Sequence, residues 1–133
     1  GKVKVIRITA AHDLGRVINP LLADEQVRGG AVQGFGGALY EHCIYDDHAQ
    51  LQNGTLADYL TPMAGEMPDI DVGHVQTPTT ESELGAKGAG ESGTGAAPAA
   101  VFNAVNDALR PFKARVWEQP ITPEIVLTAL GKI

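Results

Sequence analysis

A single carboxylate lies in a glycine-rich run in the second half of the chain. The run extends from Gly85 to Gly95, and Glu91 is the only acidic residue within it. Glycines let a backbone bend sharply and approach a ligand closely, at an entropic cost that an idle loop need not carry. A carboxylate with so few side chains around it has the unobstructed reach that general acid–base catalysis requires first. We therefore take Glu91 as the candidate catalytic residue.

A helix is expected shortly after this carboxylate. Pro98 precedes the apolar stretch 99–109, and proline is favoured in the first turn of a helix. The unpaired N–H groups of a helix N-terminus attract anions. The pattern predicts that Glu91 lies in a loop before a helix that opens at Pro98.

Two other interpretations of the glycine-rich run remain open. Residues 88–93 match the dinucleotide fingerprint by letter, but that fingerprint requires a strand directly before it and an acidic residue about 20 positions later. Residues 78–83 instead favour coil, and Lys87 lacks the Ser or Thr that follows it in a phosphate-binding loop. A free-standing nucleotide-binding protein is therefore the least favoured of the functions considered. A plain glycine-rich connector with an incidental Glu remains the non-catalytic interpretation of this run.

A second glycine-rich segment follows Asn19-Pro20, the favoured pair of residues at a helix N-cap and first turn. The predicted helix runs to Glu41. Each interior glycine costs about 1 kcal/mol relative to Ala, and this segment holds five of them: Gly29, Gly30, Gly34, Gly36 and Gly37. Because about 5 kcal/mol is more than an isolated helix can absorb, something must pack tightly on this helix.

Helical spacing aligns four positions on one stripe of that helix: Gln26, Gly30, Gln33 or Gly34, and Gly37. The missing side chains form a groove with an amide group at its end. Contact with another helix or a sheet through small residues is the favoured interpretation, and entry of a ligand into the groove is the alternative.

Composition limits the class of protein. The 133 residues, of which 44% are hydrophobic and 20% charged, suffice for one modest core, so we treat 1–133 as one domain piece. The net charge of −6 and the scattered Lys and Arg residues argue against nucleic-acid binding. No stretch reaches the roughly 18 apolar residues of a membrane span.

Other catalytic and metal-binding classes lack their residues. Cys43 is the only cysteine, so no disulfide framework or cysteine-held cluster is available, and a reducing, cytoplasmic location is expected. The four histidines show no metal-ligand spacing, and neither Ser82 nor Ser92 lies in a nucleophile elbow. The sequence therefore does not favour hydrolysis by a serine nucleophile.

The remaining elements predict an α+β fold. Alternation predicts strands over 2–8 and 69–77, a hairpin over 43–52 and a short strand over 114–117. Thr122-Pro123-Glu124 starts a last helix that runs to Leu130 and is stopped by Gly131. Since this order has no βαβ rhythm, we expect a mixed sheet with the glycine-rich helix and C-terminal helices.

Three segments in order, 13–20, 26–36 and 85–91, resemble the xanthine dehydrogenase and aldehyde oxidase family of molybdenum hydroxylases. The likeness extends over essentially the whole chain and is greatest to the C-terminal end of the molybdopterin-binding large subunit. That subunit is several times longer, so the resemblance implies a fragment of its second cofactor-binding domain that holds only part of the site.

The resemblance also implies roles for individual residues. Glu91 matches the family's catalytic glutamate, a general base toward a hydroxyl on molybdenum, and Gln26 matches a glutamine that hydrogen-bonds the cofactor. Four further residues fall in segments that line the pterin and dinucleotide in relatives: Asp13, Asn19, Lys87 and Gly88. The protein supplies no direct metal ligand in this family.

The implied reaction inserts oxygen from water into an electron-poor carbon of an aldehyde or an aromatic N-heterocycle. The implied cofactor is molybdenum–molybdopterin, in its cytosine dinucleotide form. Electrons would leave through iron–sulfur clusters to FAD on partner subunits. The non-catalytic alternative is an interaction module whose glycine-rich helix packs on a partner subunit.

Overall fold

The computed structural model describes all 133 residues, which divide into two compact units. The sheet unit comprises residues 5–34 and 67–97, and the helical unit comprises residues 1–4, 35–66 and 98–133. The two long helices, α1 (Pro20–Leu39) and α2 (Ser92–Leu109), each contribute residues to both units.

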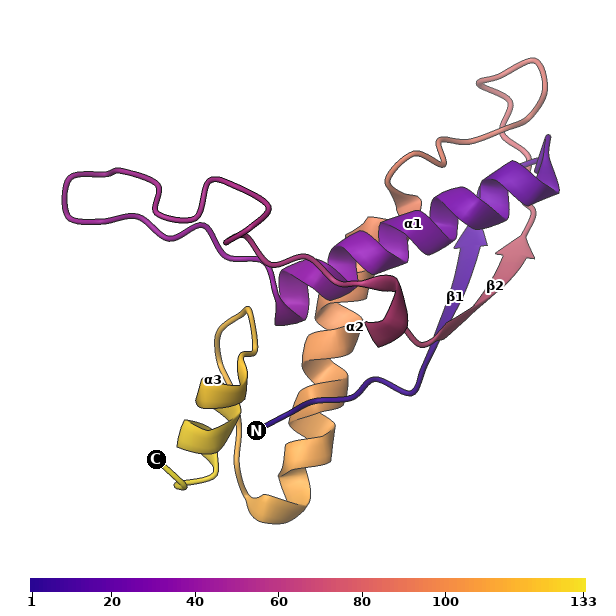
Figure 1. Ribbon diagram of the computed structural model, residues 1–133. Coiled ribbons are helices and arrows are strands. Elements are labelled where there is room, and N and C mark those ends of the chain that lie inside the picture. Colours follow the sequence, from indigo (N-terminus) through magenta and orange to yellow (C-terminus); the bar gives the residue numbers. More distant parts are fainter. The chain divides into compact units, whose positions relative to one another are not determined.

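The sheet unit contains two strands that run side by side in the same direction (Figure 1). Strand β1 (Arg7–Asp13) pairs in parallel with β2 (Asp69–Val75), in a register from Arg7 opposite Asp69 to Asp13 opposite Val75. Half-buried and exposed residues alternate along both strands. The α+β class is confirmed, and the expected mixed sheet is replaced by a parallel pair with α1 in the connection.

The strand predicted over 69–77 is confirmed as β2, whereas the strand predicted from residue 2 begins only at Arg7. Since β2 starts opposite Arg7, residues 2–6 have no neighbouring strand with which to pair.

The start of α1 follows the prediction. The Asn19 side chain accepts a hydrogen bond from the Leu22 N–H at 3.2 Å, and Pro20 is the first helical residue. The helix ends at Leu39, two residues before the predicted end, where the Gly36 carbonyl accepts from the N–H groups of both Tyr40 and Glu41.

Helix α2 begins at Ser92, so the prediction that it opens at Pro98 is wrong, and Pro98 lies inside the helix. Close packing on α1 explains this difference. A Cβ atom on Gly30 would lie 2.8 Å from the Gly93 Cα, and the Thr94 hydroxyl donates to the Gly30 carbonyl at 3.2 Å. These contacts hold the first turn of α2, and Pro98 then costs the helix one backbone hydrogen bond.

The helical unit has an aliphatic core. Val101, Val105 and Leu109 recur at helical spacing on α2 and are buried, as are Phe35 of α1 and Val126 of α3 (Pro123–Ala129). Two 3₁₀ turns, η1 (Ala64–Glu66) and η2 (Arg110–Phe112), complete the elements.

The last helix is confirmed. Thr122 caps α3 by accepting from the Ile125 N–H at 3.3 Å, and Gly131 ends it at a φ of 63°. The hairpin predicted over 43–52 is confirmed in reduced form, as a turn closed by an isolated antiparallel bridge between Tyr45 and Leu51.

The strand predicted over 114–117 does not form. The side chain of Asn106, on α2, accepts from the Val116 N–H at 3.0 Å and donates to its carbonyl at 3.3 Å. One amide side chain thus satisfies the backbone groups that a neighbouring strand would otherwise pair.

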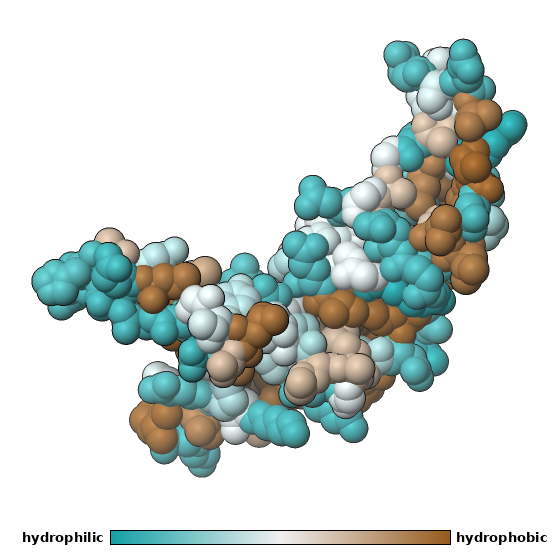
Figure 2. Space-filling model, turned by 45° about the horizontal axis from the view of Figure 1, so that its top comes forward, coloured by the Kyte–Doolittle hydropathy of each residue, from teal (hydrophilic) through white to brown (hydrophobic).

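Hydrophobic residues reach the surface in several places among hydrophilic ones (Figure 2). In the sheet unit, six large apolar side chains are exposed: Ile6, Ile18, Leu21, Leu22, Val75 and Leu84. None of the helices combines the length and the apolar character needed to cross a bilayer.

Candidate functional site

A cavity of about 420 Å³ lies in the sheet unit beyond the C-terminal end of β1. Its walls come from the loop after β1, the first two turns of α1 and the glycine-rich segment: Leu14, Arg16, Val17, Ile18, Asn19, Leu22, Ala23, Gln26, Ala86, Lys87, Ala89 and Gly90. None of these residues is acidic. The carboxyl ends of parallel strands are a common location for ligand sites, and this wall suits a ligand with an anionic part.

Glu91 directly follows the last cavity residue, Gly90, and directly precedes Ser92, the first residue of α2. Its carbonyl accepts from the Thr94 N–H at 3.1 Å, and the residue is exposed. The prediction that Glu91 precedes a helix N-terminus is therefore confirmed, with the helix starting earlier than expected.

Gln26, on α1, contacts Gly90, the residue before Glu91, although the two are 64 positions apart in the sequence. Its Nε2 donates to the Gly90 carbonyl at 2.6 Å. A glutamine amide carries two N–H donors and a carbonyl acceptor. One N–H and the carbonyl oxygen therefore stay available to a ligand in the cavity.

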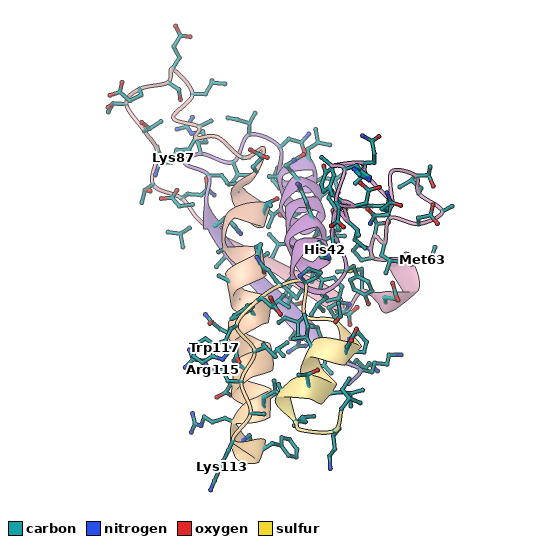
Figure 3. The ribbon with its side chains drawn as sticks, turned by 90° about the vertical axis from the view of Figure 1, so that its left-hand side faces the viewer. His42, Met63, Lys87, Lys113, Arg115 and Trp117 are labelled. Carbon is teal, nitrogen blue, oxygen red and sulfur yellow. The ribbon has the colours of Figure 1, made fainter.

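Asp13 and Lys87 meet beside the cavity, and Figure 3 labels Lys87 on the segment that leads into α2. The Lys87 Nζ lies 2.9 Å from the Asp13 carboxylate, and each side chain is about one-third exposed, at 38% and 33%. Hydrogen bonds from the Thr77 hydroxyl, then from Lys87, then from the Gly15 and Thr77 N–H groups hold the pKa of Asp13 well below its usual range.

Asn19 lines the cavity while its side chain caps α1. Gly88 lies in the same glycine-rich segment but outside the cavity wall. A Cβ atom at Gly88 or at Gly90 would meet no atom of this chain within 4 Å. Packing within the chain thus does not account for these two glycines, whereas a ligand that approaches the backbone would.

Other glycines of this region have a reason within the chain. Gly15 and Gly85 have φ angles of 64° and 72°, a conformation that other residues adopt at a cost. Gly30 and Gly93 pack against each other. The stripe predicted on α1 is therefore used at Gly30 for helix packing, as the favoured interpretation expected, and Gly37 meets nothing within 4 Å.

Arg16 is a cavity residue that the sequence did not single out. It is exposed and follows Gly15 in the loop after β1. Its position inside the segment 13–20, one of the three segments on which the family resemblance rests, is the signal that could have found it. No group of three or more His, Cys, Asp or Glu side chains is placed to hold a metal ion.

Comparison with known proteins connects this geometry to a family. The model of the molybdopterin cofactor-binding domain matches residues 1–68. The nicotine 6-hydroxylase large subunit of Paenarthrobacter nicotinovorans is 45% identical over 129 residues, which cover 97% of this chain and 16% of that protein. The xanthine dehydrogenase molybdenum-binding subunit of Escherichia coli O157:H7 is 38% identical over 124 residues, which cover 92% of this chain and 16% of that protein.

The fold agrees with that of a solved relative. The crystal structure of quinoline 2-oxidoreductase from Pseudomonas putida 86 matches with a TM-score of 0.92 and 43% identity, over 97% of this chain and 16% of that one. The chain thus spans 16% of the length of these relatives. It belongs to the molybdopterin cofactor-binding domain family, as part of a molybdenum-binding large subunit of the xanthine dehydrogenase and aldehyde oxidase type.

Proposed function

We propose that this chain is part of a molybdenum hydroxylase that inserts water-derived oxygen into an electron-poor carbon of an aldehyde or an aromatic N-heterocycle. The observation that carries the proposal is the junction of Gly90 and Glu91. Gly90 lines the cavity and is held by Gln26, and the next residue is a carboxylate at the start of α2.

The residues around the cavity fit a molybdopterin cofactor. Gly88 and Gly90 leave the backbone open to a ligand, and Gln26 and Asn19 offer amide groups. Arg16 supplies a cation suited to phosphate oxygens. We propose that these residues, with Lys87 in the wall and Asp13 beside it, form the chain's part of the cofactor site, and that the cofactor is the cytosine dinucleotide form.

When bound, the cofactor supplies a metal centre that accepts two electrons from the substrate. The chain's own contribution is a base: Glu91 takes a proton from the water-derived oxygen as that oxygen forms its bond to carbon. The overall change converts R–H and water into R–OH, two protons and two electrons. General-base catalysis of this kind is worth about 10²–10⁴-fold in rate.

The two electrons require acceptors outside this chain. We propose an iron–sulfur subunit and an FAD subunit as partners, together with the remainder of the large subunit. Relatives carry the names "large subunit" and "subunit gamma", which indicate multi-subunit assemblies. The exposed apolar side chains of the sheet unit outside the cavity, such as Ile6 and Leu84, offer surface for such neighbours.

We further propose that the assembly works in the cytoplasm. The single cysteine, Cys43, is exposed and unpaired, in keeping with a compartment where disulfides are rare.

The test is the molybdenum and cytidine nucleotide content of the native complex, captured from source cells with an antibody to this segment, with the intact mass of the captured subunit. We expect about one molybdenum and one cytidine nucleotide per subunit. A metal-free complex would refute the hydroxylase and favour the non-catalytic interaction module. Molybdenum without cytidine would refute the dinucleotide form alone.

A further inference from the structure

Four donors converge on the carboxylate of Asp13 at the end of β1. Its Oδ1 accepts from the Gly15 N–H at 2.9 Å and from the Thr77 N–H at 3.2 Å. Its Oδ2 accepts from the Lys87 ammonium at 2.9 Å and from the Thr77 hydroxyl. Lys87 also donates to the Thr77 hydroxyl oxygen at 2.8 Å, which closes a triangle of three side chains.

The triangle joins three stretches of the sheet unit that are far apart in sequence. Asp13 is the last residue of β1, Thr77 lies two residues beyond the end of β2, and Lys87 belongs to the glycine-rich segment. Backbone bonds reinforce the junction, because the Lys87 N–H donates to the Leu14 carbonyl at 2.8 Å and the Arg16 N–H to the Gly85 carbonyl at 2.9 Å.

The charged groups of the triangle have little capacity left for a ligand. A carboxylate accepts about four hydrogen bonds and an ammonium donates three, and Asp13 accepts four while Lys87 donates two. The low pKa of Asp13 keeps its carboxylate charged at neutral pH. Moving the Lys87 ammonium onto a phosphate would leave that charge without its cation.

Few bonds fix the chain between Lys87 and Glu91: within it, the Ala89 carbonyl accepts from the Ser92 hydroxyl at 3.1 Å and from the Ser92 N–H at 3.4 Å, which ties it to the start of α2. The intervening residues are Gly88, Ala89 and Gly90, and glycines carry the largest backbone freedom. The triangle holds one end of this tripeptide, and the bond from Gln26 to the Gly90 carbonyl holds the other. A displacement of about 1 Å at a reacting group costs on the order of 10²-fold in rate, so these two attachments bear directly on the Glu91 carboxylate.

We propose that Asp13, Thr77 and Lys87 are positioning residues, which fix the Glu91 segment by binding one another rather than the cofactor. This inference rests on the proposed function, since the triangle affects the reaction only if Glu91 is the general base. Among the residues proposed for the cofactor site, Asp13 and Lys87 then act by positioning the Glu91 segment, and the contacts to the cofactor itself come from the other residues of the cavity.

The experiment uses the assembled holoenzyme with Lys87→Met, alone and combined with Glu91→Gln, and with Lys87→Arg as the conservative variant. Molybdenum content, kcat, KM and amide hydrogen exchange over 86–91 are measured. We expect Lys87→Met to keep wild-type molybdenum content and KM, to lower kcat on the order of 10²-fold, and to speed exchange over 88–91. Lys87→Arg should recover part of kcat.

The double variant separates positioning from a general structural role. If the triangle acts through Glu91, Lys87→Met causes no further loss of kcat in the Glu91→Gln background. The proposal would be overturned if the double variant lost kcat by the product of the two single losses. It would also be overturned if Lys87→Met left the hydrogen exchange over 88–91 unchanged, or if it lost molybdenum in parallel with kcat. Thr77→Val, which keeps the Asp13–Lys87 ion pair but removes the hydroxyl, gives a milder version of the same test if Lys87→Met does not assemble.

A matched control comes from the ion pair that joins the two strands near their amino ends, Arg7 with Asp71. Arg7→Met removes a cation of the same sheet without touching the triangle, and we expect wild-type kcat and exchange. If Glu91→Gln by itself keeps near wild-type kcat, the proposed base fails. The hydrogen exchange of Lys87→Met then still reports whether the triangle holds the segment.

Discussion

Each end of the β1–β2 pair carries an ion pair, and the surroundings of the two ion pairs differ. At the amino end, Arg7 and Asp71 are 3.3 Å apart with side chains 71% and 57% exposed. At the carboxyl end, Asp13 binds Lys87, Thr77 and two backbone N–H groups. Isolated exposed pairs contribute between 0 and 1 kcal/mol. A pair embedded in a network can instead fix the geometry of the segment it holds.

The comparison separates the end of the strand pair that borders the candidate site from the end that does not. The cavity, Gln26 and the Glu91 segment all lie beyond the carboxyl end of β1, whereas the amino end borders none of them. In a parallel pair the loops that leave the carboxyl ends converge. The fold therefore brings residues 13–26 and 85–91 together at this end of the strand pair.

The largest expected effect comes from removing the carboxylate at the carboxyl end. Glu91→Gln preserves the size of the side chain and one acceptor oxygen but removes the base, so kcat should fall by about 10³-fold with molybdenum content unchanged. Asp71→Asn at the amino end serves as the control and should keep the wild-type kcat. A Glu91→Gln enzyme with near wild-type turnover would remove Glu91 from the mechanism.

The next largest effect is expected from the packing of α1 on the first turn of α2. A Cβ at Gly30 would lie 2.8 Å from backbone atoms at Gly93 and Thr94, and backbone cannot yield as a side chain can. Gly30→Ala should therefore destabilise the assembled enzyme by about 2–3 kcal/mol. Gly29→Ala meets nothing within 4 Å and should be neutral or stabilising by up to about 1 kcal/mol. Thermal denaturation of both variants checks the contrast, and equal midpoints would contradict it.

A smaller effect is expected from the helix cap at the cavity. Asn19→Ala removes the acceptor of the Leu22 N–H and should cost about 1 kcal/mol of stability. Thr122→Ala removes the corresponding cap of α3 in the helical unit, at a similar cost. Only Asn19→Ala should also lower the cytidine nucleotide content, which is measured after complete hydrolysis of the purified complex. A loss in both variants would place Asn19 outside the cofactor site.

The smallest expected effect is on stability at acidic pH. The pKa of Asp13 is lowered by its hydrogen bonds, so its carboxylate contributes stability that is fully present above the ordinary carboxyl range and lost as pH falls below it. The difference in urea midpoint between wild type and Asp13→Asn should thus be constant from about pH 8 to pH 5 and shrink below about pH 4. A difference that already shrinks between pH 7 and pH 5 would contradict the ionised network.

Local chemistry made part of this fold predictable. Asn19-Pro20 and Thr122-Pro123 marked both helix starts, because a cap and a first-turn proline act within a few residues. The start of α2 escaped prediction because its cause is tertiary. Gly30, 63 positions away from Gly93, holds the first turn of α2 and overrides the signal at Pro98.

The candidate site divides in the same way. Gly90 and Glu91 stood out because Glu91 is the one carboxylate in the glycine-rich run from Gly85 to Gly95, which is a local feature of the sequence. The bond from Gln26 to Gly90 and the role of Thr77 depend on contacts over 64 positions, and no local pattern encodes them. The same holds for the strand expected over 114–117, where the Asn106 side chain replaced a neighbouring strand.

The most direct test of the central claim is the position of molybdenum in crystals of the holoenzyme, located by its anomalous scattering. The account predicts a single peak per large subunit next to the Glu91 carboxylate, at the end of the cavity where Gln26 holds Gly90. A peak elsewhere, away from Glu91 and Gln26, would contradict it.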